Sequence, residues 1–366
     1  MISLAQNGYT HEEVLKMLES SRTVEYDFDV FNNTEIKVGS LNSASGTITI
    51  DSESEIMGTA NIRYLREPIL DGLVEWRLRP ALKLKSPKGW LKYSLGVYIM
   101  TTPTKTDSTG TASCQASGYD YNLILRDDKV TGGYFVAAGT NYVNAVNTLL
   151  ISAGIKKLKV SQSSATLSVP LEWEIGTSKL TIINELLSAI NYEPIHFDSN
   201  GYAISKRYEV PENRVAEYAY QTNSNSLILP NGSMTTDMFG KANVFVRYTE
   251  SPDGVELKST YENTSPASPL SISSRGRRIV DIESVQDIAD QQTLDDYTKR
   301  VAVEKSQGEE QVTITTAAMP HHSYRDCLYV SVNGIEVRNR YIEYGWSIDL
   351  SPGGHMSHRL KKVVKI

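Results

Sequence analysis

Cysteine is scarce in this 366-residue sequence, which contains only Cys114 and Cys327. A disulfide-stabilised scaffold needs more cysteines in a shorter chain, and a structural zinc site normally needs four ligands close together. Both cysteines are therefore expected to be reduced, structural thiols. The small residues around Cys114, in Thr111–Ala116, predict a buried strand position, and nothing in the sequence supports a Cys–His nucleophile pair.

The sequence also lacks the segments that direct a chain to a membrane or across it. Residues 1–8 contain neither the basic n-region nor the apolar h-region of a signal peptide. No stretch approaches the roughly 20 consecutive apolar residues that a membrane-spanning helix needs. We expect synthesis in the cytoplasm, no signal peptide and no membrane span.

An excess of basic charge is missing as well. The chain has 37 Lys and Arg against 43 Asp and Glu, a formal net charge of −6. This balance argues against nucleic-acid binding, which needs a basic face or stripe. The one dense basic run is His358–Lys362, for which a solvated final strand is expected and a phosphate-binding patch is the alternative.

The usual catalytic motifs are absent too. The sequence contains no H-E-x-x-H, no G-x-S-x-G and no G-x-x-x-x-G-K-[ST]. The neighbouring acidic pairs Asp295-Asp296 and Glu309-Glu310 do not face each other on a helix or strand, so we expect them to be solvated. A glycoside hydrolase needs two carboxylates opposed across a cleft, an arrangement that a sequence does not reveal.

The six histidines offer no obvious metal site. His321 and His322 are adjacent, so in a strand they would point to opposite faces and could not bind one metal together. His355 and His358 lie three apart, but the turn residues Ser351–Gly354 oppose a helix that would align them. We predict no catalytic, cofactor-binding or metal-ligating residues.

Strand patterns dominate what is present. Val24–Val30 alternates apolar residues with Glu25, Asp27 and Asp29, which predicts one buried face and one acidic, solvated face. At least four more strands follow with no helix between them, which indicates a first barrel or sandwich. These strands are expected around 48–50, 60–64, 74–78 and 95–99, with a tight turn at Ser86–Gly89.

Helix signals are fewer and more localised. Thr10 and Glu13 form a capping box before a short N-terminal helix that must dock on the body or on a neighbouring subunit. Two amphipathic helices are predicted at about 142–153 and 179–190, and a third from Ser284 to about Glu304 with Asp287 in the capping-box position.

The C-terminal block returns to strands. Asn333-Gly334 is a strong hairpin signal between two β-rich runs, and Tyr344–Leu350 alternates in a further strand. About 55 residues is slim for a separate barrel, so this block is expected to complete a sheet begun earlier. A second turn is predicted at Ser251–Gly254, and the polar stretch Thr101–Gly110 is interpreted as a crossing between domains.

The length suits two to four domains. The predicted fold class is mainly β with α+β insertions: two β-barrel-like domains and a projecting α+β middle region. The predicted divisions are an N-terminal helical arm (1–22), a first β-barrel (23–104), an α+β domain (105–208), a β-hairpin and helix region (209–308) and a C-terminal sheet completing a second barrel (309–366).

The order of these parts resembles the tail hub family of tailed phages and phage-derived contractile particles. Three stretches carry the resemblance: the opening strands Tyr26–Val30, Ile48–Asp51 and Ala60–Tyr64; Ile279–Ile282 leading into the Ser284 helix; and the closing segment Pro352–Leu360 with its glycines and basic finish.

The resemblance implies a non-enzymatic structural protein of the virion tail, without cofactors. Three copies would form a ring in which two similar barrels per chain alternate around a pseudo-sixfold torus. Its partners would be further copies of itself, the tail tube or a distal tail protein, and a spike, fibre or tape-measure protein.

Two alternatives of other classes stay open. One is a cell-wall hydrolase of unrecognised type. The other is a carbohydrate-binding β-protein, which would need exposed aromatic platforms; its candidates are Trp76, Trp90, Trp173 and Trp346.

Overall fold

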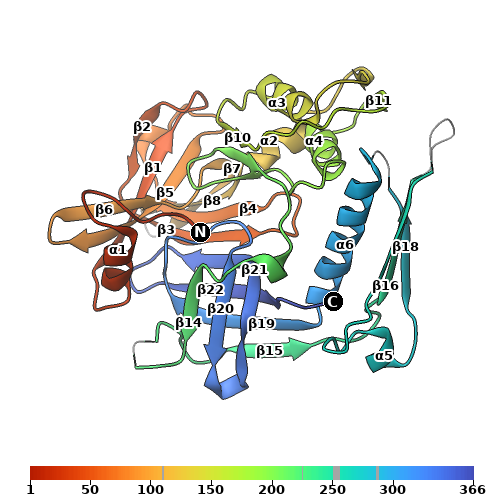
Figure 1. Ribbon diagram of the computed structural model, residues 1–366. Coiled ribbons are helices and arrows are strands. Elements are labelled where there is room, and N and C mark those ends of the chain that lie inside the picture. Colours follow the sequence, from red (N-terminus) through yellow and green to blue (C-terminus); the bar gives the residue numbers. More distant parts are fainter. Residues whose placement is uncertain (109–110, 225, 250–255, 286–287) are drawn as a thin grey trace.

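The computed structural model describes residues 1–366 except 109–110, 225, 250–255 and 286–287, and it describes no side chains for residues 107–112. More of the chain is strand (40%) than helix (19%). The largest unit is a 14-stranded sheet that Figure 1 shows running through the body of the molecule. Its strands are β1 (Val24–Phe31), β2 (Lys37–Leu41), β3 (Ala44–Asp51), β4 (Gly58–Leu65), β5 (Arg77–Ser86), β6 (Gly89–Ser94), β7 (Tyr98–Ser108), β8 (Thr111–Tyr119), β14 (Tyr218–Gln221), β15 (Ser233–Thr236), β19 (Glu310–Ala317), β20 (Cys327–Val332), β21 (Val337–Asp349) and β22 (His355–Lys362).

The main sheet joins the two ends of the chain. Its strand order is β15-β19-β22-β21-β3-β4-β8-β7-β5-β1-β2, with β6 on β5 and with β20 linking β14 to β21. The antiparallel pairing of β21 with β3 confirms that the C-terminal block completes a sheet begun earlier. The mainly-β fold with α+β insertions is confirmed, while the strand pairings of the described residues close no barrel.

The N-terminal helix α1 (His11–Leu18) docks on the first half of this sheet. The predicted capping box is present, because the Thr10 hydroxyl accepts from the Glu13 amide and the Glu13 carboxylate accepts from the Thr10 amide. Val14 and Leu18 are fully buried in the same core as strands β1 to β8.

The α+β region packs around its own core of buried aliphatic side chains, at the top right of Figure 1. Helices begin and end near the predicted places, with Asn141 and Ser178 as N-caps and Gly154 at φ 86° just after the first of them. The elements are α2 (Asn122–Asp127), β9 (Tyr134–Val136), α3 (Tyr142–Ser152), β10 (Leu158–Val160), β11 (Leu171–Trp173), α4 (Lys179–Ser188), β12 (His196–Phe197) and β13 (Ala203–Ser205).

A third unit stands at the right of Figure 1, where helix α6 lies between a small sheet and the body. The sheet order is β17-β16-β18, and α6 packs on β16 and β17 through a small core around Phe245. Its elements are β16 (Val244–Tyr248), β17 (Lys258–Glu262), α5 (Ile272–Arg275), β18 (Val280–Ser284) and α6 (Gln291–Gln307). Three 3-10 turns complete the inventory: η1 (Pro68–Leu70), η2 (Pro211–Asn213) and η3 (Asn333–Ile335).

The predicted start of the third helix is wrong. Ser284 ends strand β18, and the helix begins at Gln291 because the Asp290 side chain accepts from the Thr293 amide as the N-cap. Asp287 and the predicted turn at Ser251–Gly254 lie outside the described residues. The hairpin itself is confirmed, since β16 and β17 pair antiparallel.

The prediction that the polar stretch from Thr101 crosses between domains is wrong for residues 101–108. These residues continue strand β7, which pairs with β8. Residues 102–106 of this polar stretch are exposed, as fits a strand with side chains that face solvent. The hairpin at Asn333 is confirmed, although its loop extends through a 3-10 turn to Glu336 at φ 54°.

The division into five domains stays a prediction. Among the described residues, no helix is long and apolar enough to cross a membrane.

The acidic face of β1 is not simply solvated. The Asp29 carboxylate accepts hydrogen bonds from Lys37, Lys92 and Ser40 at 2.7–2.8 Å, and the residue is 8% exposed. Burial by itself would raise the pKa of Asp29, but these hydrogen bonds outweigh it and lower the pKa to about 2. Lysines from β2 and β6 thus neutralise a partly covered carboxylate.

Asp29→Asn is expected to lower the free energy of unfolding by about 1 kcal/mol at pH 7, after allowing for solvent screening. Because the folded-state pKa lies below the ordinary value, this stability is present above about pH 4 and disappears as the pH falls toward 2. Urea unfolding at pH 7, 5 and 3 measures it, with Glu25→Gln, which removes an exposed partner of Lys83, as control. A difference between Asp29→Asn and the unaltered chain that stays constant from pH 7 down to pH 3 would contradict the assignment.

Candidate functional site

A buried polar cluster lies where the C-terminal strands meet. Glu343 lies on β21, His358 on the neighbouring β22, and His322 in the loop between β19 and β20. The β21–β22 register shifts between Glu343 and Gly345, which marks a bulge at Tyr344. Strict alternation would put Glu343 and Trp346 on opposite faces, so the bulge places Glu343 on the same face as Trp346 and its cross-strand partner His358.

One carboxylate joins the two imidazoles. Glu343 Oε2 lies 2.6 Å from His322 Nδ1, and Glu343 Oε1 lies 2.5 Å from His358 Nδ1. The opposite ring nitrogens also have partners: His322 Nε2 lies 2.8 Å from the Tyr220 hydroxyl, and His358 Nε2 lies 2.8 Å from the Thr316 hydroxyl. All four ring nitrogens are therefore satisfied inside the protein.

Burial and charge oppose each other at this cluster. Burial of Glu343 would raise the pKa of its carboxyl, but the two histidines beside it outweigh burial and lower that pKa to about 2. The pKa of His358 is lowered, because burial outweighs the attraction of Glu343. An ionised Glu343 with hydrogen-bonded imidazoles on both sides is the state that this geometry favours.

A second acidic group lies next to the cluster. Asp326 Oδ2 is 3.9 Å from His322 Nδ1, and Asp326 Oδ1 lies 2.8 Å from the Met1 amine. The Ser323 amide and hydroxyl also donate to this carboxylate, each at 2.7 Å. His321 is fully buried beside the cluster, neither of its ring nitrogens has a partner among the described residues, and burial lowers its pKa well below the ordinary value.

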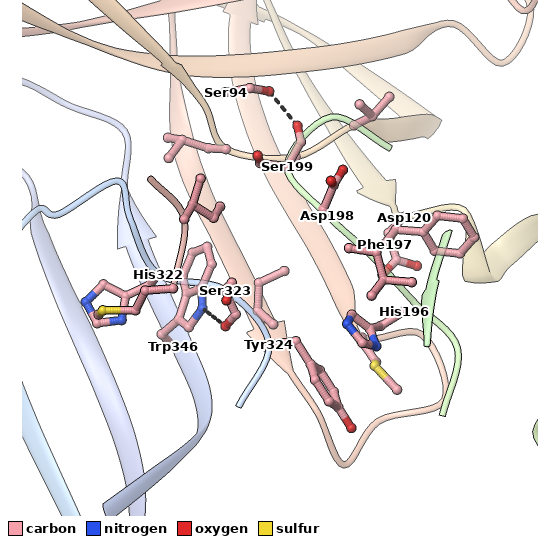
Figure 2. Close-up of a pocket in the computed structure, with 18 of the residues that line it drawn as sticks. Ser94, Asp120, His196, Phe197, Asp198, Ser199, His322, Ser323, Tyr324 and Trp346 are labelled. Carbon is pink, nitrogen blue, oxygen red and sulfur yellow. Dashed lines mark hydrogen bonds between the residues drawn. The ribbon is translucent and has the colours of Figure 1, made fainter. Parts of the chain in front are cut away.

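A cavity of about 410 Å³ opens beside the cluster, between the main sheet and the α+β region. Figure 2 shows His322 and Trp346 at one side of it and His196 and Phe197 at the other, with Tyr324 between them. The His196 ring stacks on Tyr324 at a centroid distance of 4.0 Å.

Two carboxyl groups in the cavity wall are perturbed by burial. Burial raises the pKa of Asp120 to about 7 against the opposing hydrogen bonds from the Asn122 and Gly58 amides. It also raises the pKa of Glu193, whose Oε2 has no hydrogen-bond partner among the described residues. His196 carries a pKa lowered to about 4, again mainly by burial. No Ser, Thr or Cys nucleophile is hydrogen-bonded to a histidine in this wall as described.

The structure brings His322, Glu343 and His358 together, although they are far apart in the sequence. His321 and His322 lie in a buried loop rather than a strand, and His358 is buried while His355 is exposed. The cluster was missed because Glu343 comes from another strand. The one signal in the sequence was Glu343 itself, an acidic residue flanked by apolar residues in its strand.

The structure also places other residues that the sequence singled out. Cys114 is buried in β8 as predicted. Glu309 is 6% exposed, so the prediction that it is solvated is wrong. In β22, Arg359 pairs with Asp51 and Lys362 with Glu310, so this final strand is an inner, ion-paired strand rather than a solvated one.

The four tryptophans do not form exposed platforms. Trp76, Trp173 and Trp346 are at most 9% exposed. Trp90 is half-buried, and the ammonium groups of Lys83 and Lys85 each lie 5.0 Å from its ring centroid. A stacked sugar would have to displace these contacts.

No family model matches the sequence, and no curated protein matches it either. Solved structures do resemble the fold over nearly the whole chain. A tail protein from Neisseria meningitidis MC58 matches with a TM-score of 0.66 at 14% identity, covering 92% of this chain and 97% of that chain.

Two further solved structures point the same way. The 43 kDa tail protein of prophage MuSo2 from Shewanella oneidensis matches with a TM-score of 0.62 at 10% identity, covering 92% of this chain and 98% of that one. The prophage tail protein gp18 from Listeria monocytogenes EGD-e matches with a TM-score of 0.54 at 11% identity, covering 92% and 95%. The fold is thus that of phage tail proteins, as the predicted resemblance requires.

Glu343→Ala is expected to lower the free energy of unfolding by about 3 kcal/mol or more, because two buried imidazole N–H groups lose their acceptor. Chemical denaturation at pH 7 measures the loss. Glu172→Ala, at an exposed position in β11, serves as control and should change stability by less than about 0.5 kcal/mol. A loss below 1 kcal/mol for Glu343→Ala would mean that the network contributes little.

Proposed function

We propose that this chain is a structural subunit of the tail tip of a phage-like particle, in which three copies form a hub ring. The main observation behind the proposal is that the similarity to solved tail proteins extends over nearly the whole of both chains. More than nine tenths of this chain matches more than nine tenths of three tail proteins. A match of that extent leaves little of the chain for a separate activity.

The edges of the main sheet supply a physical reason for a ring. The strand order ends at β2 on one side and at β15 on the other, and Figure 1 shows β2 at the upper left and β15 at the bottom of the molecule. Each edge exposes an apolar side chain, Val38 at 39% and Met234 at 44%. Pairing the β2 edge of one copy with the β15 edge of the next would cover both, and a head-to-tail contact of this kind closes into a ring when the rotation allows.

We assign a part of the proposed ring to each of the predicted domains. The sheets of 23–104 and 309–366 would form the torus, with the arm 1–22 bound to it and the α+β domain 105–208 projecting from it. One face would meet the tail tube or a distal tail protein, and the other a spike, fibre or tape-measure protein. The proposed location is the virion tail, after assembly in the host cytoplasm.

The proposed role is non-enzymatic. The cluster at Glu343 has its ring nitrogens occupied, and the cavity beside it offers no nucleophile paired with a base among the described residues. Any wall-cleaving activity would belong to a partner.

Purified protein is expected to form trimers, or to assemble with a tube or spike partner. Val38→Lys and Met234→Lys should each lower the assembled fraction, because a charge at a sheet edge opposes edge pairing. Val215→Lys is the matched control, since Val215 is 79% exposed but lies in a loop outside the strands. Mass photometry measures the distribution; monomers at every workable concentration, without assembly on either partner, would count against the ring.

The chain alone is expected to show no clearing of cell-wall polymers in a zymogram. A clearing band that a single carboxylate substitution, or substitution of Cys114, abolishes would refute the non-enzymatic role. A cooperative thermal transition of the same preparation should show that the protein is folded. Unfolding is then excluded as the cause of inactivity.

A further inference from the structure

The cluster around Glu343 has the donor set of a transition-metal site. Among the described residues it is the one group of three His, Cys, Asp or Glu whose ligand atoms all lie within 4.8 Å of one another. Two imidazoles and one carboxylate are ligands that zinc commonly takes. All three residues are at most 4% exposed, so the group is not an ordinary surface cluster.

The outer contacts of the two histidines fit the same chemistry. A metal-bound histidine usually donates its other ring N–H to an oxygen, which fixes the ring and its tautomer. With a metal at Nδ1, the Nε2–H of His322 would donate to the Tyr220 hydroxyl and that of His358 to the Thr316 hydroxyl. Both hydroxyls already lie 2.8 Å from those nitrogens.

We propose that His322 Nδ1, His358 Nδ1 and the Glu343 carboxylate bind one divalent transition metal of the zinc class. Asp326 Oδ2 lies 3.9 Å from His322 Nδ1 and is within reach as a fourth ligand. Two carboxylates then balance the charge of the ion. This structural site would tie β21 and β22 to the loop that precedes β20.

Metal binding at Nδ1 moves the proton of each imidazole from Nδ1 to Nε2. In the metal-free cluster each Nδ1–H donates to Glu343; in the metal-bound form each neutral imidazole carries its proton on Nε2, so no proton is released. Ligand atoms about 2.0 Å from a tetrahedral ion lie roughly 3.3 Å apart. The Nδ1–oxygen distances of 2.5 and 2.6 Å must therefore lengthen by less than about 1 Å.

The cavity gives the ion a route to the cluster. His322, Ser323 and Trp346 contribute to its wall, and Figure 2 shows His322 at one side of this space. A buried metal site needs such an entry path.

The test uses full-length protein with a tag that contains no histidine, freed of metal with EDTA and dialysed against one equivalent of zinc. Inductively coupled plasma mass spectrometry should find one zinc per chain, and the Tm should rise on zinc addition. Cobalt, added in place of zinc, should give the visible bands of four-coordinate Co²⁺.

Glu343→Gln and His358→Gln should each weaken zinc binding at least tenfold, and Tyr220→Phe should weaken it about tenfold through loss of the outer contact. His196→Gln is the matched control, because His196 is a buried histidine in the wall of the same cavity but lies outside the cluster. It should bind zinc as the unaltered chain does.

If the ligand variants do not fold, X-ray absorption of the zinc-loaded unaltered protein decides instead, by showing two imidazole ligands and oxygen ligands only. Absence of retained zinc together with absence of a cobalt spectrum would overturn the proposal. Equal zinc binding by Glu343→Gln and His358→Gln, or an absorption spectrum without two imidazoles, would overturn it as well.

Discussion

The antiparallel pairing of β3 with β21 is the contact on which the rest of the structure depends. Within the described part of the main sheet, it is the only strand pairing that links the N-terminal strands to the C-terminal ones. Closing a loop of nearly 300 residues costs on the order of 5 kcal/mol of chain entropy. Burial of Ile48, Trp346 and Ile348 along this pairing offsets that cost, at roughly 1.5–3 kcal/mol for each large apolar side chain.

The polar cluster is a consequence of the same strand. Beyond its pairing with β3, β21 bulges at Tyr344, and the bulge places Glu343 on the same face as His358 of β22. The loop before β20 brings His322 to the same place. In a low-dielectric interior a fully satisfied network of this kind specifies one arrangement, whereas a half-satisfied one is costly. This is why residues from three separate segments meet with all their ring nitrogens occupied.

The likeness to phage tail proteins is one of fold. At 10–14% identity the shared feature is the path of the chain through its sheets, and a fold by itself does not assign chemistry. The chemistry must come from this chain's own residues, and they supply two different things: exposed sheet edges suited to assembly, and a buried donor set beside a cavity. The two depend on different side chains, so the ring and the metal site can be tested independently.

Patterns within about ten residues were enough to predict the capping box at Thr10, helices α3 and α4, the Asn333 hairpin and the β-rich class. Three features arise only in the folded chain: the pairing of β3 with β21, the lysine contacts of Asp29 and the cluster of His322, Glu343 and His358. The reason is physical. Alternation and caps are set by neighbouring residues, whereas register, bulges and burial of a charge depend on which distant strand lies alongside, and no local pattern encodes that.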